Sequence, residues 1–485
     1  MWSPELGNGT VFIGGTWRRA DSGATFPSRN PATSDEIGAV SDAGAGETAA
    51  AIAAASAAAG GWASTTPYQR AAILLEAHRL MTEHAEDLAV LMTAEQGKPL
   101  RAARNEVRYA ADFLQWFGEE AKRVYGSTIP SARADQRFIT MHQPVGLVAA
   151  ITPWNYPISM ITRKVGPALA AGCPVILKPA EQTPLCAVAV FQLLAEAGVP
   201  AGVLSLLTTT DPVPVSQVLL ASDAVRKLTF TGSTEVGKTL AAHAAGTVKR
   251  VSLELGGHAP FLVFNDADPA HAAKGAALVK FLNTGQACIS PNRIFVQRGI
   301  YPEFLRVLAE RVGALRAGNG ADAAVSIGPL IDEQAVAKME RHTQDAVAKG
   351  ARLLAGGHRL AGEEFDQGTF FAPTVLSDVT PEMLIYREET FGPIAAVTPF
   401  DDEREAIEMA NDTAYGLASY VYTRDLSRAI RVCEALRFAI VGVNDINPTS
   451  AAAPFGGAKE SGLGREGGRE GIAEYLDTKL VGLSL

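Results

Sequence analysis

From residue 145 onward the chain alternates short, continuous apolar runs with helical stretches, and this alternation most constrains its fold. Gly and Pro bound the runs, and segments between them, such as 185–197 and 235–244, have helical spacing. Continuous apolar strands joined through helices are typical of parallel sheets buried on both faces. The sequence therefore predicts an α/β fold. The expected strands are 145–151, 175–177, 203–207, 228–230, 260–264, 294–296, 371–375, 394–398 and 439–443, and further helices are expected at 70–96 and 105–123.

Length and composition narrow the class of protein. A chain of 485 residues exceeds a single hydrophobic core, so two or three domains are expected. The formal net charge of −9 gives no electrostatic reason to bind nucleic acid or an anionic membrane. The four cysteines lack metal-ligand spacing, so neither a zinc site nor a disulfide framework is expected. With no apolar secretory segment near residue 1, these features favour a reducing compartment, the cytoplasm.

Three short segments carry residues whose chemistry suits catalysis. Cys288 follows a Gly-containing turn, where an exposed thiolate can act as a nucleophile. Glu254 stands between leucines ahead of two glycines, and an apolar setting raises a carboxyl pKa toward that of a general base at neutral pH. Asn155, in a turn fixed by two prolines, can present a rigid amide N–H to a developing oxyanion. Structural roles are the alternatives: a buried thiol, a glutamate facing solvent and an Asx-turn.

A strand, a Gly-rich turn and a helix follow one another around residues 232–239, which directs backbone N–H groups toward a phosphate. This segment, GSTEVGKT, also fits the P-loop pattern of nucleoside triphosphatases letter for letter. Two features count against a P-loop NTPase. The charge of Glu235 would oppose a bound triphosphate, and the reading leaves Glu254, Cys288 and Asn155 without a role.

Taken together, these segments resemble the NAD(P)-dependent aldehyde dehydrogenase superfamily, and within it the succinate-semialdehyde dehydrogenase type. The landmarks run through nearly the whole chain in the order of the family, with Glu254 lying 34 residues ahead of Cys288. Because the family uses the strand, turn and helix around 230–237 for its cofactor, the P-loop match becomes a coincidence. The landmarks are TPWN (152–155), KPAEQTP (178–184), FTGSTEVG (230–237), LELGG (253–257), GQAC (285–288), EETFGP (388–393) and PFGGAKESGLGREGG (454–468).

The resemblance implies a mechanism. Cys288 attacks the aldehyde carbon, and the Asn155 amide and the Cys288 backbone N–H hold the oxyanion. A nicotinamide cofactor accepts the hydride, and Glu254 activates the water that hydrolyses the thioester. NAD is expected over NADP because the carboxylate of Glu181 would accept hydrogen bonds from a ribose diol and repel a 2′-phosphate, although a solvated Glu181 would leave both acceptable. The cofactor-binding residues that the resemblance implies are Trp154, Lys178, Glu181, Gly232, Ser233, Val236, Glu389 and Phe391.

The expected substrate is a short aldehyde with a distal acid group, such as succinate semialdehyde. Residues 161–164, ITRK, match the subgroup, in which the arginine clamps the substrate carboxylate, so Arg163 is the expected clamp and Ser450 a further donor. An exposed helix arginine is the alternative. Leu282 stands where the subgroup commonly has a second arginine, which keeps glutarate or 2-oxoglutarate semialdehyde, a sulfonated or hydroxylated aldehyde and an uncharged aldehyde open. Ser290 replaces the partner of a Cys-x-Cys pair, so no disulfide switch is expected.

The resemblance also implies the aldehyde dehydrogenase fold, with a Rossmann-like cofactor domain, an α/β catalytic domain and a small β bridging and oligomerisation element. A hairpin arm over 125–142 and a strand over 475–483 should complete the sheet of a neighbour, giving a homodimer or a homotetramer. A non-catalytic protein on the same scaffold is disfavoured because nucleophile, base and oxyanion donor are all present. The expected divisions are an NAD-binding domain at 1–121 and 145–256, a catalytic domain at 257–468, and the bridging element at 122–144 and 469–485.

Overall fold

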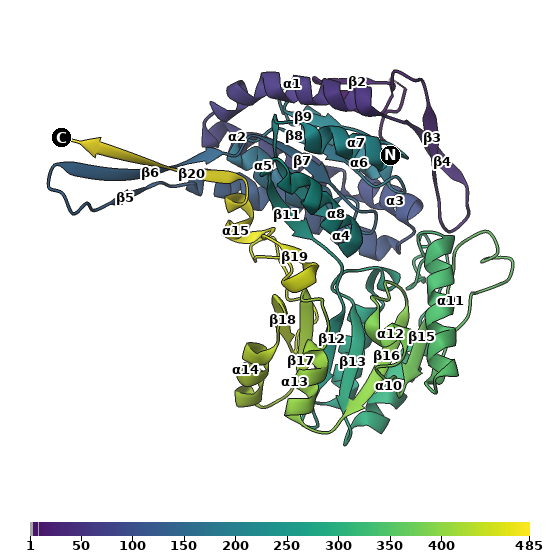
Figure 1. Ribbon diagram of the computed structural model, residues 1–485. Helices are drawn as coiled ribbons and strands as arrows, with labels where there is room; N and C mark the ends of the chain where they lie inside the picture. Colours follow the sequence, from purple (N-terminus) through teal and green to yellow (C-terminus); the bar gives the residue numbers. More distant parts are fainter. Residues whose placement is uncertain (1–2, 8) are drawn as a thin grey trace.

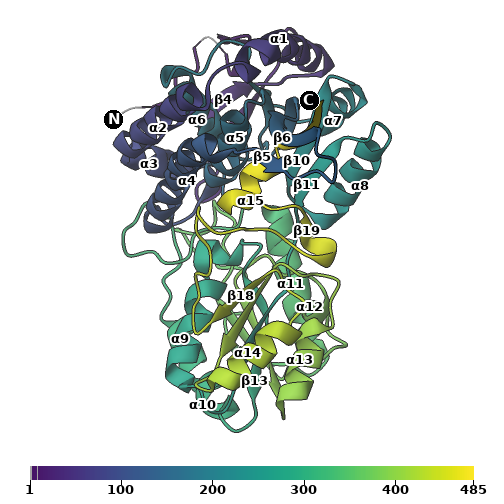
Figure 2. The ribbon, with the colours of Figure 1, turned by 90° about the vertical axis from the view of Figure 1, so that its left-hand side faces the viewer.

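The computed structural model describes residues 3–7 and 9–485, and two large mixed sheets organise it. The first sheet lies above the second in Figure 1, and a long arm projects to one side. Figure 2 shows the same stacking with the arm pointing toward the viewer. The predicted α/β class is therefore confirmed.

The first sheet has eight strands in the order β19-β11-β10-β7-β8-β9-β1-β2. The chain passes from β7 through β8 to β9, then returns to β10 and β11 on the other side of β7, and these five strands are parallel. The strand order thus reverses between β7 and β10, where doubly wound sheets leave a ligand crevice at the carboxyl ends of the strands. The bounds are β1 Val11–Ile13, β2 Thr16–Arg18, β7 Leu147–Ile151, β8 Val175–Lys178, β9 Leu204–Leu206, β10 Val225–Thr231, β11 Arg250–Glu254 and β19 Gly462–Leu463.

Helices cover both faces of this sheet. The stretch predicted as one helix over 70–96 is two, because the chain leaves helical geometry at His84, where one helix ends and the next begins. A small hairpin, β3 (Thr25–Arg29) with β4 (Glu36–Ser41), lies beside them. The helices are α1 Ala45–Ala63, α2 Pro67–Glu83, α3 Ala85–Gln96, α4 Leu100–Glu120, α5 Ser159–Ala171, α6 Pro184–Glu196, α7 Pro212–Ala221 and α8 Thr234–Ala245.

The second sheet has seven strands in the order β14-β15-β16-β13-β12-β17-β18. Helices α9 and α10 pack on one face, and α11 to α14 pack on the other. Strands β11 and β17 were absent from the predicted set. The bounds are β12 Ala259–Val263, β13 Pro291–Gln297, β14 Arg352–Ala355, β15 Thr374–Ser377, β16 Ile394–Phe400, β17 Ala418–Tyr422, β18 Ile440–Val443, α9 Pro269–Lys280, α10 Tyr301–Gly313, α11 Glu333–Ala348, α12 Leu384–Arg387, α13 Glu403–Asn411 and α14 Leu426–Ala435.

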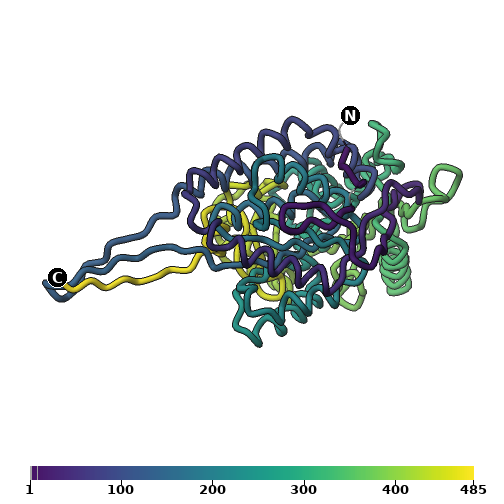
Figure 3. Tube along the Cα trace, turned by 90° about the horizontal axis from the view of Figure 1, so that it is seen from above, coloured from purple at the N-terminus to yellow at the C-terminus, as the bar shows by residue number. Residues whose placement is uncertain are grey.

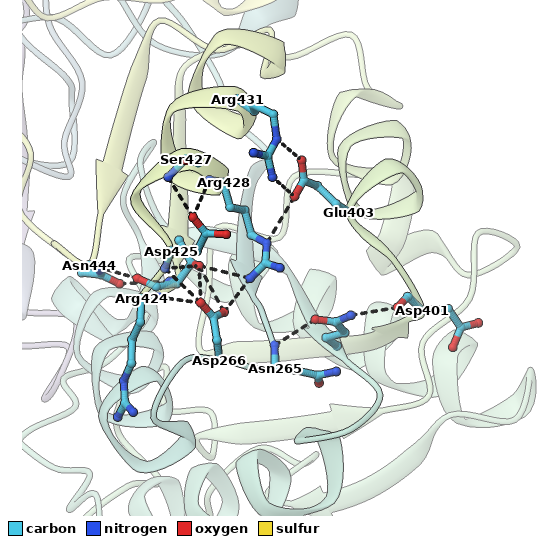
Figure 4. Close-up of polar contacts among 12 residues, drawn as sticks. Asn265, Asp266, Asp401, Glu403, Arg424, Asp425, Ser427, Arg428, Arg431 and Asn444 are labelled. Carbon is cyan, nitrogen blue, oxygen red and sulfur yellow. Dashed lines mark hydrogen bonds and ion pairs between the residues drawn. The ribbon is translucent and has the colours of Figure 1, made fainter.

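A polar network occupies the carboxyl end of the second sheet (Figure 4). Asp266, just after β12, accepts hydrogen bonds from the backbone N–H groups of Arg424 (2.9 Å) and Asp425 (3.0 Å). Arg428 pairs with Asp266 at 2.8 Å and also with Glu403 at 3.2 Å. Carboxyl ends of parallel strands are the usual place for a ligand. In this sheet the carboxylate of Asp266 accepts the hydrogen bonds of the backbone N–H groups at that end.

The arm is a three-stranded antiparallel sheet of β5 (Ser127–Ile129), β6 (Gln136–Pro144) and β20 (Leu476–Ser484). Strand β20 pairs with β6 along its full length, so the C-terminus and residues 127–144 project together (Figure 3). The predicted hairpin and C-terminal strand are present. No helix among the described residues is long and apolar enough to cross a membrane. The short helix α15 (Gly468–Ala473) connects the arm to the helices α4 and α5 beside the first sheet.

Candidate active site

The candidate site lies where the carboxyl ends of the first sheet meet the amino ends of the second. Strand β11 ends at Glu254 and β12 begins at Ala259, so residues 255–258 join the two sheets. Cys288 precedes β13, and Asn155 follows β7. A cavity of about 380 Å³ and a cavity of about 280 Å³ are both lined by Cys288. The thiol therefore stands at the junction of two spaces that can hold two different molecules.

A strained loop fixes the position of Cys288. Three consecutive residues have left-handed backbone, with φ of 50° at Asn283, 58° at Thr284 and 78° at Gly285. At Gly285 a Cβ would lie 2.2 Å from the carbonyl oxygen of Gly392, so only glycine fits there. Left-handed non-glycine residues persist only where their surroundings enforce them, and they concentrate at functional sites. This loop is the reason that the nucleophile has one defined position.

Glu254 is buried beside Cys288 and does not face solvent, so the solvent-facing alternative is wrong. Its exposed fraction is 2%, and its carboxylate interacts with the Cys288 thiol. Burial raises the pKa of Glu254 to about 7, and the positive charge of Arg163 opposes the rise. Burial and the neighbouring Glu254 also raise the pKa of the Cys288 thiol well above its usual value. A carboxyl group that titrates near neutrality can act as a general base.

Asn155 is held by hydrogen bonds at its side chain and at its backbone. Its side-chain Nδ2 donates to the carbonyl oxygen of Gln286 at 3.1 Å, which occupies one of its two N–H groups. Its backbone carbonyl oxygen accepts from Lys98 Nζ at 2.8 Å and from Asn283 Nδ2 at 2.9 Å. Asn155 and Cys288 both line the smaller cavity, and the second amide N–H is free to donate. The structure thus brings together the predicted nucleophile, base and oxyanion donor.

Arg163 lines the larger cavity together with Cys288. It is 2% exposed, so it is not a surface helix arginine. Its Nη2 lies 2.8 Å from the carboxylate of Glu466, and its guanidinium lies 4.0 Å from the ring centre of Phe455. Glu466 also pairs with the buried Lys164. Two buried basic side chains therefore share one carboxylate, and of the two only Arg163 lines the cavity.

The outer part of the larger cavity is less polar than it would be with a second arginine at position 282. Leu278 and Leu282 line it, and both are partly exposed. Ser450 is exposed and is not among the described residues that line either cavity, whereas Thr449 and Asn447 of the same loop line the larger one.

Several residues that the sequence did not single out line these cavities. Lys98 and Glu106 form a buried ion pair in the larger cavity, and Lys338 of α11 lines the smaller one. Glu466 falls within the Gly-rich segment 454–468, which was a usable signal. No signal in the sequence pointed to Lys98, because a lysine at the end of a helix ordinarily faces solvent.

The smaller cavity has the features of a nicotinamide dinucleotide site. Gly232 and the N-terminus of α8, capped by Ser233, lie at the strand-order reversal, where backbone N–H groups can meet a pyrophosphate. Trp154 and Phe391 meet edge to face, with ring centres 5.6 Å apart, and line the same space. Val236, in the first turn of α8, is about half exposed.

Two further acidic residues suit the ribose groups of such a cofactor. Glu389 accepts a hydrogen bond from the backbone N–H of Gly257 at 2.7 Å, and burial raises its pKa to about 7. At Gly256 a Cβ would lie 2.8 Å from the Glu389 carboxylate, so a side chain there would crowd this part of the cavity. At the end of β8, Lys178 pairs with the half-exposed Glu181 at 2.8 Å. The residues present therefore fit a nicotinamide cofactor.

The structure gives no support to the P-loop alternative. Helix α8 starts at Thr234, so Gly237, Lys238 and Thr239 lie inside the helix and not in a loop around a phosphate. The Lys238 side chain faces outward and pairs with Glu460 at 2.7 Å. A P-loop lysine has to reach the bound phosphates.

Comparison with known proteins agrees with this geometry. The sequence model of the "Aldehyde dehydrogenase family" matches residues 17–481. The chain is 52% identical to a 3-sulfolactaldehyde dehydrogenase of Pseudomonas putida, covering 99% of this chain and 97% of that protein. It is also 52% identical to a succinate-semialdehyde dehydrogenase of Escherichia coli whose name specifies NADP(+), covering 98% of each chain. The solved succinate-semialdehyde dehydrogenase of Burkholderia pseudomallei superposes with a TM-score of 0.96, at 49% identity and with 98% of each chain covered.

Proposed function

Because the chain belongs to the aldehyde dehydrogenase family, we propose that it oxidises a short aldehyde with a distal acid group to the carboxylic acid, with NAD as its preferred cofactor. Membership makes it an oxidoreductase that acts on aldehydes with NAD or NADP. The observation that carries the proposal is the meeting of two cavities at Cys288, with buried Glu254 beside the thiol. The aldehyde enters through the larger cavity, and the smaller cavity holds the cofactor.

Each step is assigned to a residue of the chain. The Cys288 thiol gives up its proton to water and its sulfur attacks the aldehyde carbon to form a thiohemiacetal. The free side-chain N–H of Asn155 and the Cys288 backbone N–H donate to the resulting oxyanion. When bound, the cofactor supplies the acceptor for the hydride that the thiohemiacetal carbon releases. Glu254 then takes a proton from water, which attacks the thioester and frees the carboxylic acid. The low polarity around Glu254 keeps its pKa near neutrality, so it can accept this proton.

The adenosine and pyrophosphate end of the cofactor would be held by Lys178, Glu181, Gly232, Ser233 and Val236. The nicotinamide end would be held by Trp154, Glu389, Phe391 and Lys338, which line the smaller cavity. The preference for NAD rests on the place of Glu181, beside Lys178 at the carboxyl end of β8. A carboxylate there accepts hydrogen bonds from a ribose diol but repels a 2′-phosphate.

Replacing Glu181 with Ser will raise kcat/KM for NADP about 10-fold or more relative to NAD, because it removes a like charge from beside the 2′-phosphate. Steady-state rates with each cofactor at saturating aldehyde measure the ratio. Glu196→Ser, at the far end of α6, removes an equal charge and should leave the ratio unchanged. An unchanged ratio in Glu181→Ser would show that this carboxylate does not select the cofactor.

The substrate assignment rests on Arg163, the basic residue that lines the larger cavity beside Cys288. Arg163 shares the Glu466 carboxylate with Lys164, which does not line the cavity. The Nε of Arg163 is buried without a hydrogen-bond partner in the described part of the chain. An anionic group on the substrate supplies the missing acceptor. Because Leu282 stands where a second arginine is common, Arg163 alone is expected to bind the acid group of the substrate. Succinate and glutarate semialdehydes are the leading candidates, and a sulfonated aldehyde is an alternative.

In an aldehyde panel, Arg163→Ala will raise KM for acid-bearing aldehydes roughly 10- to 100-fold, the value of one charge-assisted contact, and will change KM for uncharged aldehydes little. Cofactor reduction followed by absorbance measures both. Leu282→Arg is the matched gain-of-charge variant and should lower KM for the acid-bearing aldehydes. If uncharged aldehydes are the better substrates and Arg163→Ala affects all aldehydes equally, the substrate assignment is wrong although the reaction type stands.

The proposed domains follow the two large sheets, except that β19 of the catalytic segment pairs with β11 in the first sheet. We assign residues 1–121 and 145–256 to the cofactor domain, 257–468 to the catalytic domain, and 122–144 with 469–485 to oligomerisation. The arm leaves Ile129, Met141, Leu480 and Leu483 at least two-fifths exposed, and one edge of β20 is unpaired among the described strands. An apolar sheet with an open edge pairs readily with another strand. A second copy covering this arm gives a homodimer or a homotetramer, and a monomeric mass by light scattering would refute it.

A further inference from the structure

Lys98 is a buried cation close to the reacting groups that the proposed steps do not use. It follows α3 and has an exposed fraction of 1%. Its ammonium contacts three groups: the Glu106 carboxylate, the Asn155 carbonyl oxygen at 2.8 Å, and the Tyr156 ring, whose centre is 4.3 Å away. Burial lowers the pKa of Lys98, and the charge of Glu106 opposes that shift. A lysine this deep is costly unless its contacts serve a purpose.

Glu106, the partner of Lys98, holds the backbone that follows Asn155 in the chain. Its Oε1 accepts hydrogen bonds from the backbone N–H groups of Ile158 (3.1 Å) and Ser159 (3.2 Å), at the start of α5. Its other oxygen pairs with Lys98, which holds the carbonyl of Asn155 itself. The turn between β7 and α5, which carries Asn155, is therefore held at two points by one ion pair, formed by Lys98 of the α3–α4 loop and Glu106 of α4.

Asn155 needs such support, because its own contacts fix it only in part. Its side chain has a single hydrogen bond, from Nδ2 to Gln286. An oxyanion donor contributes most when it is fixed before the charge develops, and a displacement of about 1 Å can cost about 100-fold in rate. Strand β7 ends at Ile151, so no sheet hydrogen bonds hold residue 155.

We propose that the Lys98–Glu106 ion pair is the positioning device for the oxyanion donor, with Lys98 fixing the backbone carbonyl of Asn155 so that the free side-chain amide N–H of this residue points at the developing oxyanion. The inference rests on the proposed function, which makes Asn155 the donor. Lys98 is thus a positioning residue that acts through Asn155.

A double-mutant cycle between Lys98→Met and Asn155→Ala tests this role. Methionine keeps the length of the side chain and removes its charge, and Lys98→Met/Glu106→Gln also removes the carboxylate that would be left unpaired. Asn155→Ala should lower kcat about 100- to 1,000-fold. Lys98→Met alone should lower kcat roughly 10- to 100-fold with little change in KM. In the Asn155→Ala background, Lys98→Met should cause no further loss, because its route of action is already gone.

Lys249→Met is the matched control. Lys249 is also buried and donates to two backbone carbonyl oxygens, those of Ser222 (2.7 Å) and Val225 (2.8 Å), but it lines neither cavity. It should keep kcat while losing stability to heat. Equal losses of kcat in Lys98→Met and Lys249→Met, or a loss from Lys98→Met that persists in full without Asn155, would overturn the positioning role.

Hydrolysis of p-nitrophenyl acetate separates this inference from the proposed function. The ester reaction needs Cys288 and an oxyanion donor but no cofactor and no aldehyde. If the protein oxidises no aldehyde yet the ester cycle is non-additive, the proposed function fails and the positioning role stands. If aldehydes are oxidised and both cycles are additive, the proposed function stands and the positioning role fails.

Discussion

Replacing Glu254 with Gln will preserve one rapid round of NADH formation and slow every later turnover about 100- to 10,000-fold, the usual contribution of a general base. The amide has nearly the shape of the carboxylate but cannot accept a proton from water. Thiohemiacetal formation and hydride release remain possible, so the thioester on Cys288 accumulates. Rapid mixing should show a burst close to one NADH per active site, followed by a slow steady state.

The pH dependence of the steady-state rate gives a second test of the role of Glu254. Burial raises the pKa of Glu254 to about 7, and only the deprotonated form is a base. In the wild-type enzyme the steady-state rate should therefore rise as the pH increases through about 7 and level off above it. The inflection should disappear in Glu254→Gln. A variant that loses the burst together with the steady state would instead assign Glu254 to activating the thiol, and the hydrolytic role would be wrong.

Cys288→Ala will abolish aldehyde oxidation, with a loss of about 10,000-fold or more, because no second cysteine is among the described residues that line the two cavities. Neither a burst nor a steady state should be visible. Cofactor binding should persist, because the smaller cavity is otherwise intact, and equilibrium titration with NAD measures it. Residual turnover within about 10-fold of wild type would exclude the thioester mechanism.

The other cysteines provide the control for this experiment. Cys433 lies on α14, is partly exposed and lines neither cavity. Cys433→Ala should keep full activity and the same burst. Alkylation with iodoacetamide should then inactivate the wild-type and Cys433→Ala proteins at the same rate. Equal rates exclude Cys433 as the sensitive thiol, and Cys173 and Cys186 are 0% exposed, which leaves Cys288.

Most of the fold and the reacting trio were accessible from the sequence because local signals agreed with the global architecture. Apolar runs bounded by Gly and Pro are sufficient to predict strands buried on both faces, and most of them formed. Strand β11 was missed because its residues, Arg250–Glu254, overlap the motif around Glu254 and alternate polar with apolar side chains. The P-loop match shows the opposite error, since a pattern of eight letters does not define whether a glycine and a lysine lie in a loop or in a helix.

The environment of each charged group was beyond the sequence. The sequence alone could identify Arg163 as a candidate clamp for a substrate carboxylate. It could not show that Glu466, about 300 residues later, pairs with both Arg163 and Lys164. It could not distinguish Lys98 from a solvated lysine at a helix end, nor could it give Ser450 and Thr449 different positions relative to the cavity. Burial, pairing and pKa depend on which distant segments meet, and tertiary packing alone determines those meetings. The sequence by itself determined the family and the α/β architecture and predicted the nucleophile, because those depend on local pattern and on ordered motifs. Only the tertiary structure decided which charges are neutralised, which donor is free and where the two cavities join.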